Sequence, residues 1–264
     1  MNVVGGRLGS IRANPHSSVK TALKALLRRS AFAKGVVTAL RGVWLDCHVL
    51  IWSTTRNRTI ERYLQTAETT KLHLGASHNR LEGWLNSDVA PGSGMIYLDV
   101  TRRFPFADDT IDYVFAEHLI EHVDHEDALT MLREAWRVLK PGGKIRIATP
   151  DLGVIVQLHG ADRTEAQKDY VDWIVARCMP FVDRCKEVFV INNAFHAWGH
   201  RFLYDRELLA LTLSRLGFTD LTFCKPGDSS DPQLRALEAH GREIQNEEIN
   251  HFETFVVEAR ALKH

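Results

Sequence analysis

The sequence predicts an open, doubly wound α/β sheet with mostly parallel strands. From residue 71 onward, short apolar runs alternate with stretches of helical periodicity, which is typical of parallel strands joined by helices. Glycines and prolines separate many of these runs, as turns require. The 264 residues are 45% hydrophobic and 25% charged, so the chain has the composition of a globular protein with a substantial core.

Seven short apolar runs are predicted to form the strands. They are brief enough to be strands, and polar or turn-forming residues flank them. In chain order the runs are 71–74, 83–87, 95–98, 111–116, 144–148, 221–224 and 252–258.

Two of the predicted helices have clear ends. The first begins near Asp124, carries apolar residues three or four positions apart, and is stopped by Pro141-Gly142-Gly143. The second is capped by Asp205 and stops at Gly217. Both helices precede a predicted strand, as the alternating α/β pattern requires.

Charge divides the chain into a basic helical extension, residues 1–70, and an α/β domain, residues 71–264. The extension has eleven lysines and arginines against three acids, a difference of +8, in a chain whose net charge is zero. A helical pattern at 17–27 and an apolar stretch at 43–52, too short to span a bilayer, fit either a peripheral membrane helix or a lid on the domain. We favour the lid, and keep a membrane or protein partner of residues 1–70 as the alternative.

Residues 152–203 interrupt the α/β alternation. They contain one helical pattern. Their last residues belong to the aromatic and histidine-rich stretch "NNAFHAWGHRFLYD". We interpret them as an insertion on the substrate side of the domain. The four cysteines lie far apart and nothing at the amino terminus resembles a secretory signal, so we expect reduced thiols and a cytoplasmic location, with membrane association as an option.

Small and acidic residues follow three of the predicted strands. Gly75-Ala76-Ser77 forms a tight turn that lets a ligand approach the backbone. Asp88 is placed to accept hydrogen bonds from ribose hydroxyls, and Asp99 to meet an exocyclic amine of a base. Strand-terminal aspartates also cap helices, so only the joint order of these residues favours a nucleoside site. The turn "GASHNR" lacks the Gly-x-Gly-x-x-Gly pattern and excludes a nicotinamide dehydrogenase.

Together, the segments "KLHLGASHN", "GWLNSDV", "MIYLDVTRRFPFADDTIDYVFAEHLIEHV" and "LREAWRVLKPGGKIRIATPD" resemble the class I S-adenosylmethionine-dependent methyltransferases. With the tail "HRFLYDRELLALTLSRLGF", the chain is similar to small bacterial members of surface-polysaccharide gene clusters. The resemblance implies a Rossmann-like sheet with an antiparallel last strand and S-adenosylmethionine as cofactor. It implies that the cofactor-binding residues are Gly75, Ala76, Ser77, Asp88, Asp99, Val100 and Glu117.

The chain departs from that family at two positions of the first-strand motif. His73 stands where the family has an acid, and Ser77 where it has a second glycine. The lost acid removes a partner for the methionine amino group, which leaves a non-catalytic relative as an alternative.

The segment "AEHLIEHVDHED" is dense in acids and histidines. His118-x-x-Glu121-His122 resembles the Glu-x-x-Glu-His motif by which ubiquinone-pathway and small-RNA 2′-O-methyltransferases hold a divalent metal. Such residues also brace helix ends without any ligand, so we expect no metal. If a metal is bound, the candidate ligands are His118, Glu121 and His122, with His196 or His200 from the insertion as a further ligand.

The predicted catalytic residues are His118, His196 and Glu117. Imidazole titrates near neutrality and suits removal of a proton from an alcohol, so we expect an oxygen acceptor. The resemblance to members of surface-polysaccharide gene clusters implies a sugar or glycan hydroxyl first and another small-molecule hydroxyl next. A nucleic-acid methyltransferase is an alternative because residues 1–70 are basic, but the remainder is acidic and we do not expect a nucleic-acid partner.

Overall fold

The computed structural model describes residues 52–263. The predicted features at 17–27 and most of 43–52 lie outside that part of the chain, so the lid and its membrane or protein partner stay predictions. Within residues 52–263, no helix combines the length and the apolar character needed to cross a bilayer.

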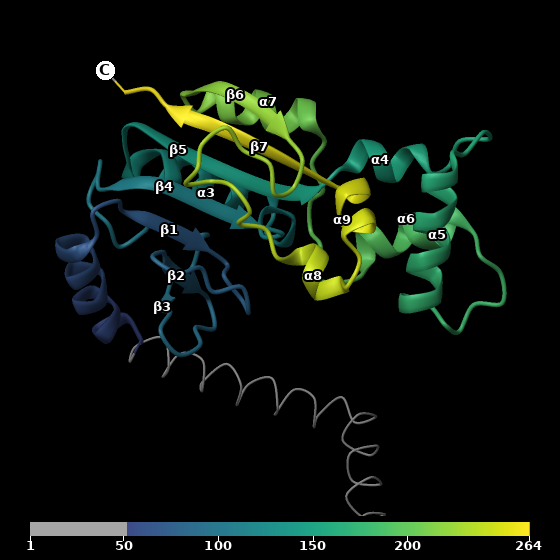
Figure 1. The fold of residues 1–264 in the computed structure, drawn as a ribbon, viewed down its shortest axis with the longest axis horizontal. Coiled ribbons are helices and arrows are strands. Elements are labelled where there is room, and N and C mark those ends of the chain that lie inside the picture. Colours follow the sequence, from purple (N-terminus) through teal and green to yellow (C-terminus); the bar gives the residue numbers. More distant parts are fainter. Residues whose placement is uncertain (1–51, 264) are drawn as a thin grey trace, which may run out of the picture. The chain divides into compact units, whose positions relative to one another are not determined.

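The described chain is built on a seven-stranded sheet in the order β3-β2-β1-β4-β5-β7-β6 (Figure 1). The pairs among β1 to β5 are parallel, whereas β7 runs antiparallel to both β5 and β6. This confirms the predicted sheet and its antiparallel last strand. The strand bounds are Lys71–Leu74 (β1), Leu85–Asp88 (β2), Ile96–Tyr97 (β3), Ile111–Glu117 (β4), Leu139–Pro150 (β5), Phe218–Cys224 (β6) and Thr254–Ala261 (β7).

Several predicted strand bounds differ from the structure by a few residues, and the largest difference lies at the start of β5. The motif Pro141-Gly142-Gly143 lies inside β5 rather than between helix and strand. Leu139 pairs with Ile111 and Lys144 with Tyr113, so the motif is the extra length of a register shift in the ladder. Gly142 has φ +80° there, a conformation that suits glycine.

Helices cover one face of the sheet and form its main core. Alternation along the strands sends Leu72, Leu74 and Val114 to this face, where they are fully buried. The helices are one over residues 52–66, α3 (His125–Val138) and α7 (Arg206–Arg215). The first lies within the predicted extension 1–70, yet its Ile60 is part of the core and the hydroxyl of its Tyr63 donates to the Lys71 carbonyl at 3.0 Å.

Residues 225–239 help to cover the opposite face. Leu234 and Leu237 pack there against Trp84 and Phe115. The fully buried Arg146 of β5 holds this segment, because its Nε donates to Glu238 at 2.6 Å and its Nη1 to the Asp228 carbonyl at 2.9 Å. The segment leads directly to the next helix, α8.

A group of short helices beyond the carboxyl ends of the strands has a hydrophobic core of its own (Figure 1). Three come from the predicted insertion: α4 (Leu152–Gln157), α5 (Glu165–Cys178) and α6 (Glu187–His196). The carboxyl-terminal part adds α8 (His240–Ile244) and α9 (Glu247–Glu253). This core joins Ile174 and Val190 of the insertion to Ile249 of α9, so distant segments meet at the strand ends.

Candidate functional site

The turn after β1 is constrained by its neighbours. Gly75 has φ +63°, and a Cβ atom at this position would lie 2.8 Å from the Leu119 side chain. The Ala76 N–H donates to the Ser87 carbonyl at 2.9 Å and ties the turn to β2. The tight turn predicted after β1 is therefore present, and only glycine fits its first position without strain.

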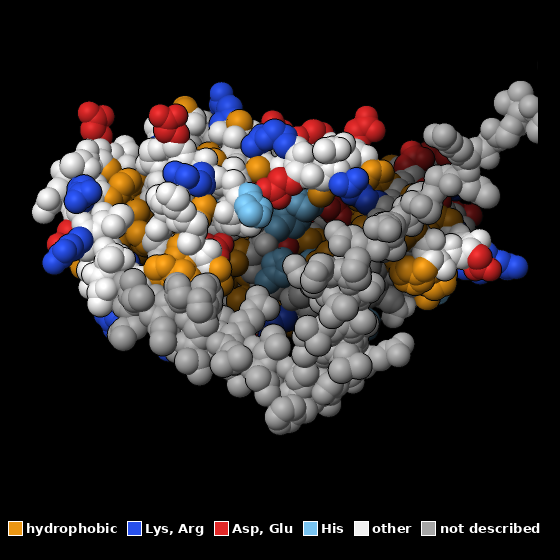
Figure 2. Space-filling view, turned by 90° about the horizontal axis from the view of Figure 1, so that it is seen from below, with side chains coloured by type: hydrophobic (Ala, Val, Ile, Leu, Met, Phe, Trp, Pro, Cys, Tyr) orange, Lys and Arg blue, Asp and Glu red, His pale blue; other side chains and the backbone are white. Residues whose placement is uncertain are grey.

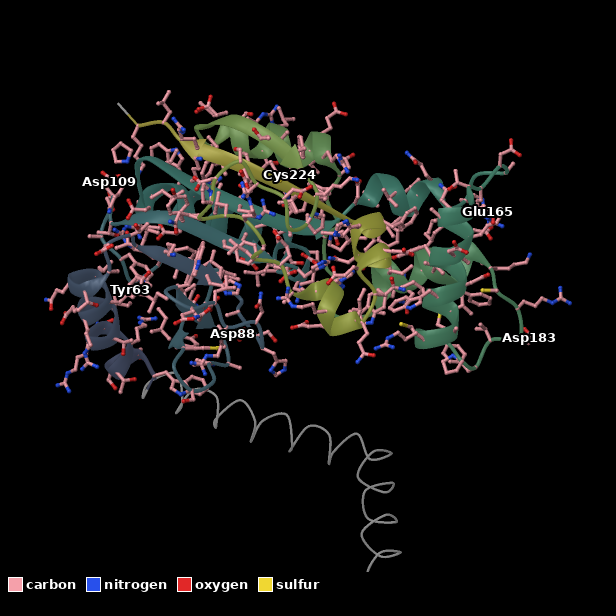
Figure 3. The ribbon with its side chains drawn as sticks, in the orientation of Figure 1. Tyr63, Asp88, Asp109, Glu165, Asp183 and Cys224 are labelled. Atoms are coloured by element: carbon pink, nitrogen blue, oxygen red, sulfur yellow. The ribbon has the colours of Figure 1, made fainter. Side chains whose placement is uncertain are left out.

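Asp88 and Asp99 lie at the ends of adjacent strands but already have local partners. The Asp88 carboxylate accepts the N–H of Ser77 at 3.0 Å and of Ala90 at 2.8 Å, so it links the first two strand-end loops (Figure 3). Asp99 accepts the N–H and the hydroxyl of Thr101 and pairs with Arg102 at 3.1 Å. Each carboxylate oxygen has two lone pairs, so both groups keep capacity for a ligand.

Two cavities adjoin above the strand ends. The first, about 150 Å³, lies at β1 and β4, and the second, about 370 Å³, lies among the short helices. The first is lined by His73, Gly75, Ala76, Ser77, Asn79, Glu117, His118, His240 and Glu243. Asp88, Asp99 and Val100 do not line it, and Val100 belongs to the main core.

The second cavity is mostly apolar and carries several histidines. Figure 2 shows histidine side chains gathered near the middle of one face. The lining includes His118, His122, His200, His240, Tyr170, Trp173, Ile174, Arg177, Trp198 and Glu253. His118 and His240 line both cavities, so this pair forms the boundary between them.

Glu117 fastens α8 over the first cavity. Its carboxylate accepts the N–H groups of Ala239 at 2.9 Å and His240 at 2.8 Å, and the Asn79 amide at 3.3 Å. Burial raises the pKa of Glu117 above its usual range, although these backbone bonds act in the opposite direction. Glu117 is thus a cavity wall whose main partners are backbone groups.

His118 is held at both ring nitrogens. Its Nδ1 lies 2.9 Å from Glu121 and its Nε2 lies 3.2 Å from the Thr254 hydroxyl. Burial lowers the pKa of His118, but the hydrogen bond and charge of the fully buried Glu121 outweigh that effect and raise it above 6.5. These contacts orient the imidazole and favour its protonated form.

His240 is a site residue that the sequence reasoning missed. Its ring lies 4.0 Å from the His118 ring, centroid to centroid, and its Nε2 lies 3.4 Å from Glu253. Glu253 also accepts the Tyr170 hydroxyl at 2.6 Å. No motif surrounds His240 in the sequence, so only the fold brings it to the site.

The two histidines of the insertion separate. His196, predicted to be catalytic, is exposed at the end of α6 and lines neither cavity. His200 is half-buried and lines the second cavity with Trp198. A turn after α6 reverses the chain between them, so their sequence spacing gives different surroundings.

His73, which replaces the family's acid, is a buried neutral group. Its ring is 1% exposed, lies 3.1 Å from the Asn86 amide oxygen and packs on Phe115 with ring centroids 4.9 Å apart. Burial lowers its pKa to about 4, so it carries no charge at neutral pH. The carboxylates that border the same cavity are Glu117 and Glu243.

The comparisons with known proteins support the methyltransferase part of the resemblance. A family model described as a methyltransferase domain matches residues 79–147. The match runs from the turn after β1 into β5, so it supports a methyltransferase domain in that part of the chain. No curated protein matches the chain.

Several solved structures resemble the chain at low identity. A complex between the Haloferax volcanii Trm112 methyltransferase activator and a methyltransferase matches at 16% identity and TM-score 0.42, over 84% of this chain and 97% of that one. A methyltransferase of Archaeoglobus fulgidus matches at 15% and 0.44, over 77% and 92%. Phosphoethanolamine N-methyltransferase 2 of Haemonchus contortus, solved with S-adenosylhomocysteine, matches at 17% and 0.40, over 79% and 53%.

Proposed function

We propose that this protein transfers a methyl group from S-adenosylmethionine to a hydroxyl oxygen of a small molecule held in the second cavity. The observation that carries the proposal is the boundary between the two cavities, which His118 and His240 share. A donor on one side and an acceptor on the other would meet at that boundary, as in-line transfer requires.

The residues around the first cavity fit one end of the cofactor. Whole-ligand sites usually measure about 300–1,000 Å³, so a cavity of about 150 Å³ matches the amino-acid end alone. Glu117 and Glu243 offer carboxylates to its ammonium group, and the Gly75 turn offers close approach to the backbone. Asp88 and Asp99 would then hold the ribose and the adenine along the rim, outside this cavity.

His240 is our candidate for the general base. When bound, the cofactor supplies an electrophilic methyl group. Glu253 orients the His240 ring through Nε2, which leaves Nδ1 as the nitrogen that can take the acceptor's proton. His118, held at both nitrogens, positions the neighbouring ring at 4.0 Å.

The lining of the second cavity supports a small acceptor with an apolar or ring-shaped body. Trp173 and Tyr170 offer aromatic faces on which a sugar ring can stack, and Arg177 lies 5.4 Å from the Trp173 ring as the positive group of this wall. A sugar or glycan hydroxyl therefore remains our first acceptor class, and another small-molecule hydroxyl the second.

Cofactor binding is the first test of this function. Calorimetry with S-adenosylmethionine should detect binding to the full chain, and Asp88→Asn should weaken it roughly tenfold or more, because a hydrogen bond to a charged group is worth about 1.5–3 kcal/mol. Asp109→Asn is the matched control, since Asp109 pairs with Lys263 and lies away from Asp88 (Figure 3). If the unmodified chain does not bind S-adenosylmethionine, both the methyltransferase and the non-catalytic relative that binds this cofactor are excluded.

Methyl transfer is the second test. With tritiated S-adenosylmethionine and a panel of glycosides, phenols and RNA, we expect labelled small molecules, and His240→Ala should slow transfer about 100-fold or more without weakening cofactor binding. His251→Ala, exposed on α9, is the control. Labelling of RNA alone, in a salt-sensitive manner, would replace the small-molecule acceptor by a nucleic acid.

A further inference from the structure

Three side chains converge beside the second cavity, and two of them, His122 and His200, line it. The ligand atoms of Glu121, His122 and His200 all lie within 4.8 Å of one another. We propose that these three residues bind a divalent first-row transition metal, with Zn²⁺ as the leading candidate. Of the residues named from the sequence, this set keeps Glu121, His122 and His200 and leaves out His118 and His196.

Backbone contacts hold the two contributing segments together. Glu121 and His122 belong to η1 (Ile120–His122), directly after β4. The Glu121 carbonyl accepts the N–H of Arg201 at 2.8 Å and that of Phe202 at 3.3 Å. His200 directly precedes Arg201 and Phe202. The main-chain hydrogen bonds of these two residues therefore place the His200 ring beside η1.

Two of the three ligands already have the partners that orient a metal ligand. His200 Nδ1 lies 2.7 Å from the Ala194 carbonyl, so it donates there and leaves the lone pair on Nε2. The Glu121 carboxylate contacts His118 through one oxygen at 2.9 Å and the Thr149 hydroxyl through the other at 3.1 Å. A second partner of this kind is characteristic of metal-binding histidines and carboxylates.

The spacing fits one ion after small side-chain rotations. Bonds of about 2.0–2.2 Å place the ligand atoms of a tetrahedral or octahedral ion roughly 3–4 Å apart. The rings of His122 and His200 are 5.0 Å apart and inclined by 65°. The ligand atoms of the three residues lie within 4.8 Å of one another, so side-chain rotations that move these atoms by about 1 Å bring them into that range.

The donor set indicates the class of metal. Two imidazoles and one carboxylate suit Zn²⁺ or Fe²⁺ better than Mg²⁺ or Ca²⁺, which prefer oxygen ligands alone. Three protein ligands leave a coordination position open, and His122 and His200 both line the second cavity. If the proposed function holds, that position faces the acceptor and could polarise its hydroxyl.

Metal titration tests the site without S-adenosylmethionine or an acceptor. The full chain, stripped with a chelator, is titrated with Zn²⁺ by calorimetry and with Co²⁺ by visible absorption. We expect one equivalent to bind, and His200→Ala and His122→Ala each to weaken binding about 100-fold or more. His196→Ala is the matched control, because this histidine is exposed four residues from His200 and outside the cluster.

Each outcome decides the proposal. Circular dichroism checks that the variants fold, and His200→Ala, in a half-buried loop position, decides the matter should His122→Ala unfold. Absence of binding at micromolar Zn²⁺, or equal loss in His196→Ala and His200→Ala, would overturn the site. Metal binding without cofactor binding would retain this site and refute the proposed function, and the reverse result would do the opposite.

Discussion

The strand-end region, residues 71–118, and the helical region, formed by 152–203 and 240–253, build opposite sides of one site in different ways. In the strand-end region, carboxylates of Asp88, Asp99 and Glu117 accept backbone N–H groups at 2.8–3.0 Å. In the helical region, aromatic and aliphatic side chains enclose a larger, mostly apolar cavity. The strand-end region thus presents polar groups in fixed positions, and the helical region presents an apolar cavity of defined shape.

This difference separates what each side can change. The strand-end carboxylates have their positions set by the sheet, so under the proposed function the same turn and acids serve one nucleoside cofactor. The helical region has its own hydrophobic core, and its lining can vary without disturbing the strands. We infer that cofactor choice resides in the first region and acceptor choice in the second.

Removing Arg146 should have the largest effect, because this residue of β5 anchors the segment 225–239 that leads into the helical region. It is fully buried and pairs with Glu238, next to the start of α8, and with Glu258 of β7. Arg146→Leu would leave two buried carboxylates without their partner, and we expect the free energy of unfolding to fall by about 3–5 kcal/mol. Urea unfolding of the purified variant measures this loss.

The control for Arg146 is an exposed pair in the same sheet. Arg260 lies 3.6 Å from Asp220, with 45% and 69% of the side chains exposed. Arg260→Leu should cost less than about 1 kcal/mol. Equal losses for the two variants would show that the buried ion pairs of Arg146 contribute no more to stability than an exposed pair.

Acid should destabilise the strand-end region through His73. Its pKa is about 4 in the folded chain and 6.5 ordinarily, so between these values the unfolded chain binds more protons than the folded one. Stability from this residue is therefore complete above pH 6.5 and is lost as the pH falls to 4, by about 3 kcal/mol in total.

Comparison of two glutamine variants isolates that effect. His73→Gln stays neutral at every pH and should flatten the dependence of unfolding free energy on pH between 6.5 and 4. His196→Gln, at an exposed position, should retain the dependence. An unchanged pH profile in His73→Gln would mean that this histidine is accessible to protons in the folded state.

The smallest expected effect is a difference between two glycines. Gly75→Ala and Gly142→Ala both place a side chain at positive φ, which costs about 1–2 kcal/mol. The new Cβ atom at position 75 would also lie 2.8 Å from Leu119, whereas nothing lies within 4 Å at position 142. We therefore expect the free energy of unfolding to fall by about 1 kcal/mol more in the Gly75 variant than in the Gly142 variant. Thermal unfolding compares them, and equal losses would mean that Leu119 moves aside freely.

Local sequence signals predicted most of the sheet. β1 occupies the predicted residues 71–74, α3 follows Asp124 directly, and Asp205 caps α7 by accepting the Leu208 N–H at 2.7 Å. Apolar runs, caps and stops report on neighbours in the chain, so the sequence carries them directly. The Pro141-Gly142-Gly143 motif was placed outside the strand because a register shift depends on the partner strand.

The site divides along the same line. The turn at Gly75 and the acids Asp88, Asp99 and Glu117 follow strands, so strand prediction alone places them at one edge of the sheet. His196 and His200 look equivalent in sequence, yet only His200 reaches the cavity. No local pattern marks His240 or Glu253.

By itself, the sequence determined the succession of the seven strands along the chain, the helices α3 and α7, the edge at which polar residues gather, and the small-residue turn after β1. These follow from hydrophobic periodicity and turn chemistry, which act over a few residues. Only the tertiary structure decided that His118 meets His240, that His200 joins Glu121 and His122, and that Glu117 holds α8. Such contacts join segments up to about 120 residues apart, and packing across the whole domain selects them.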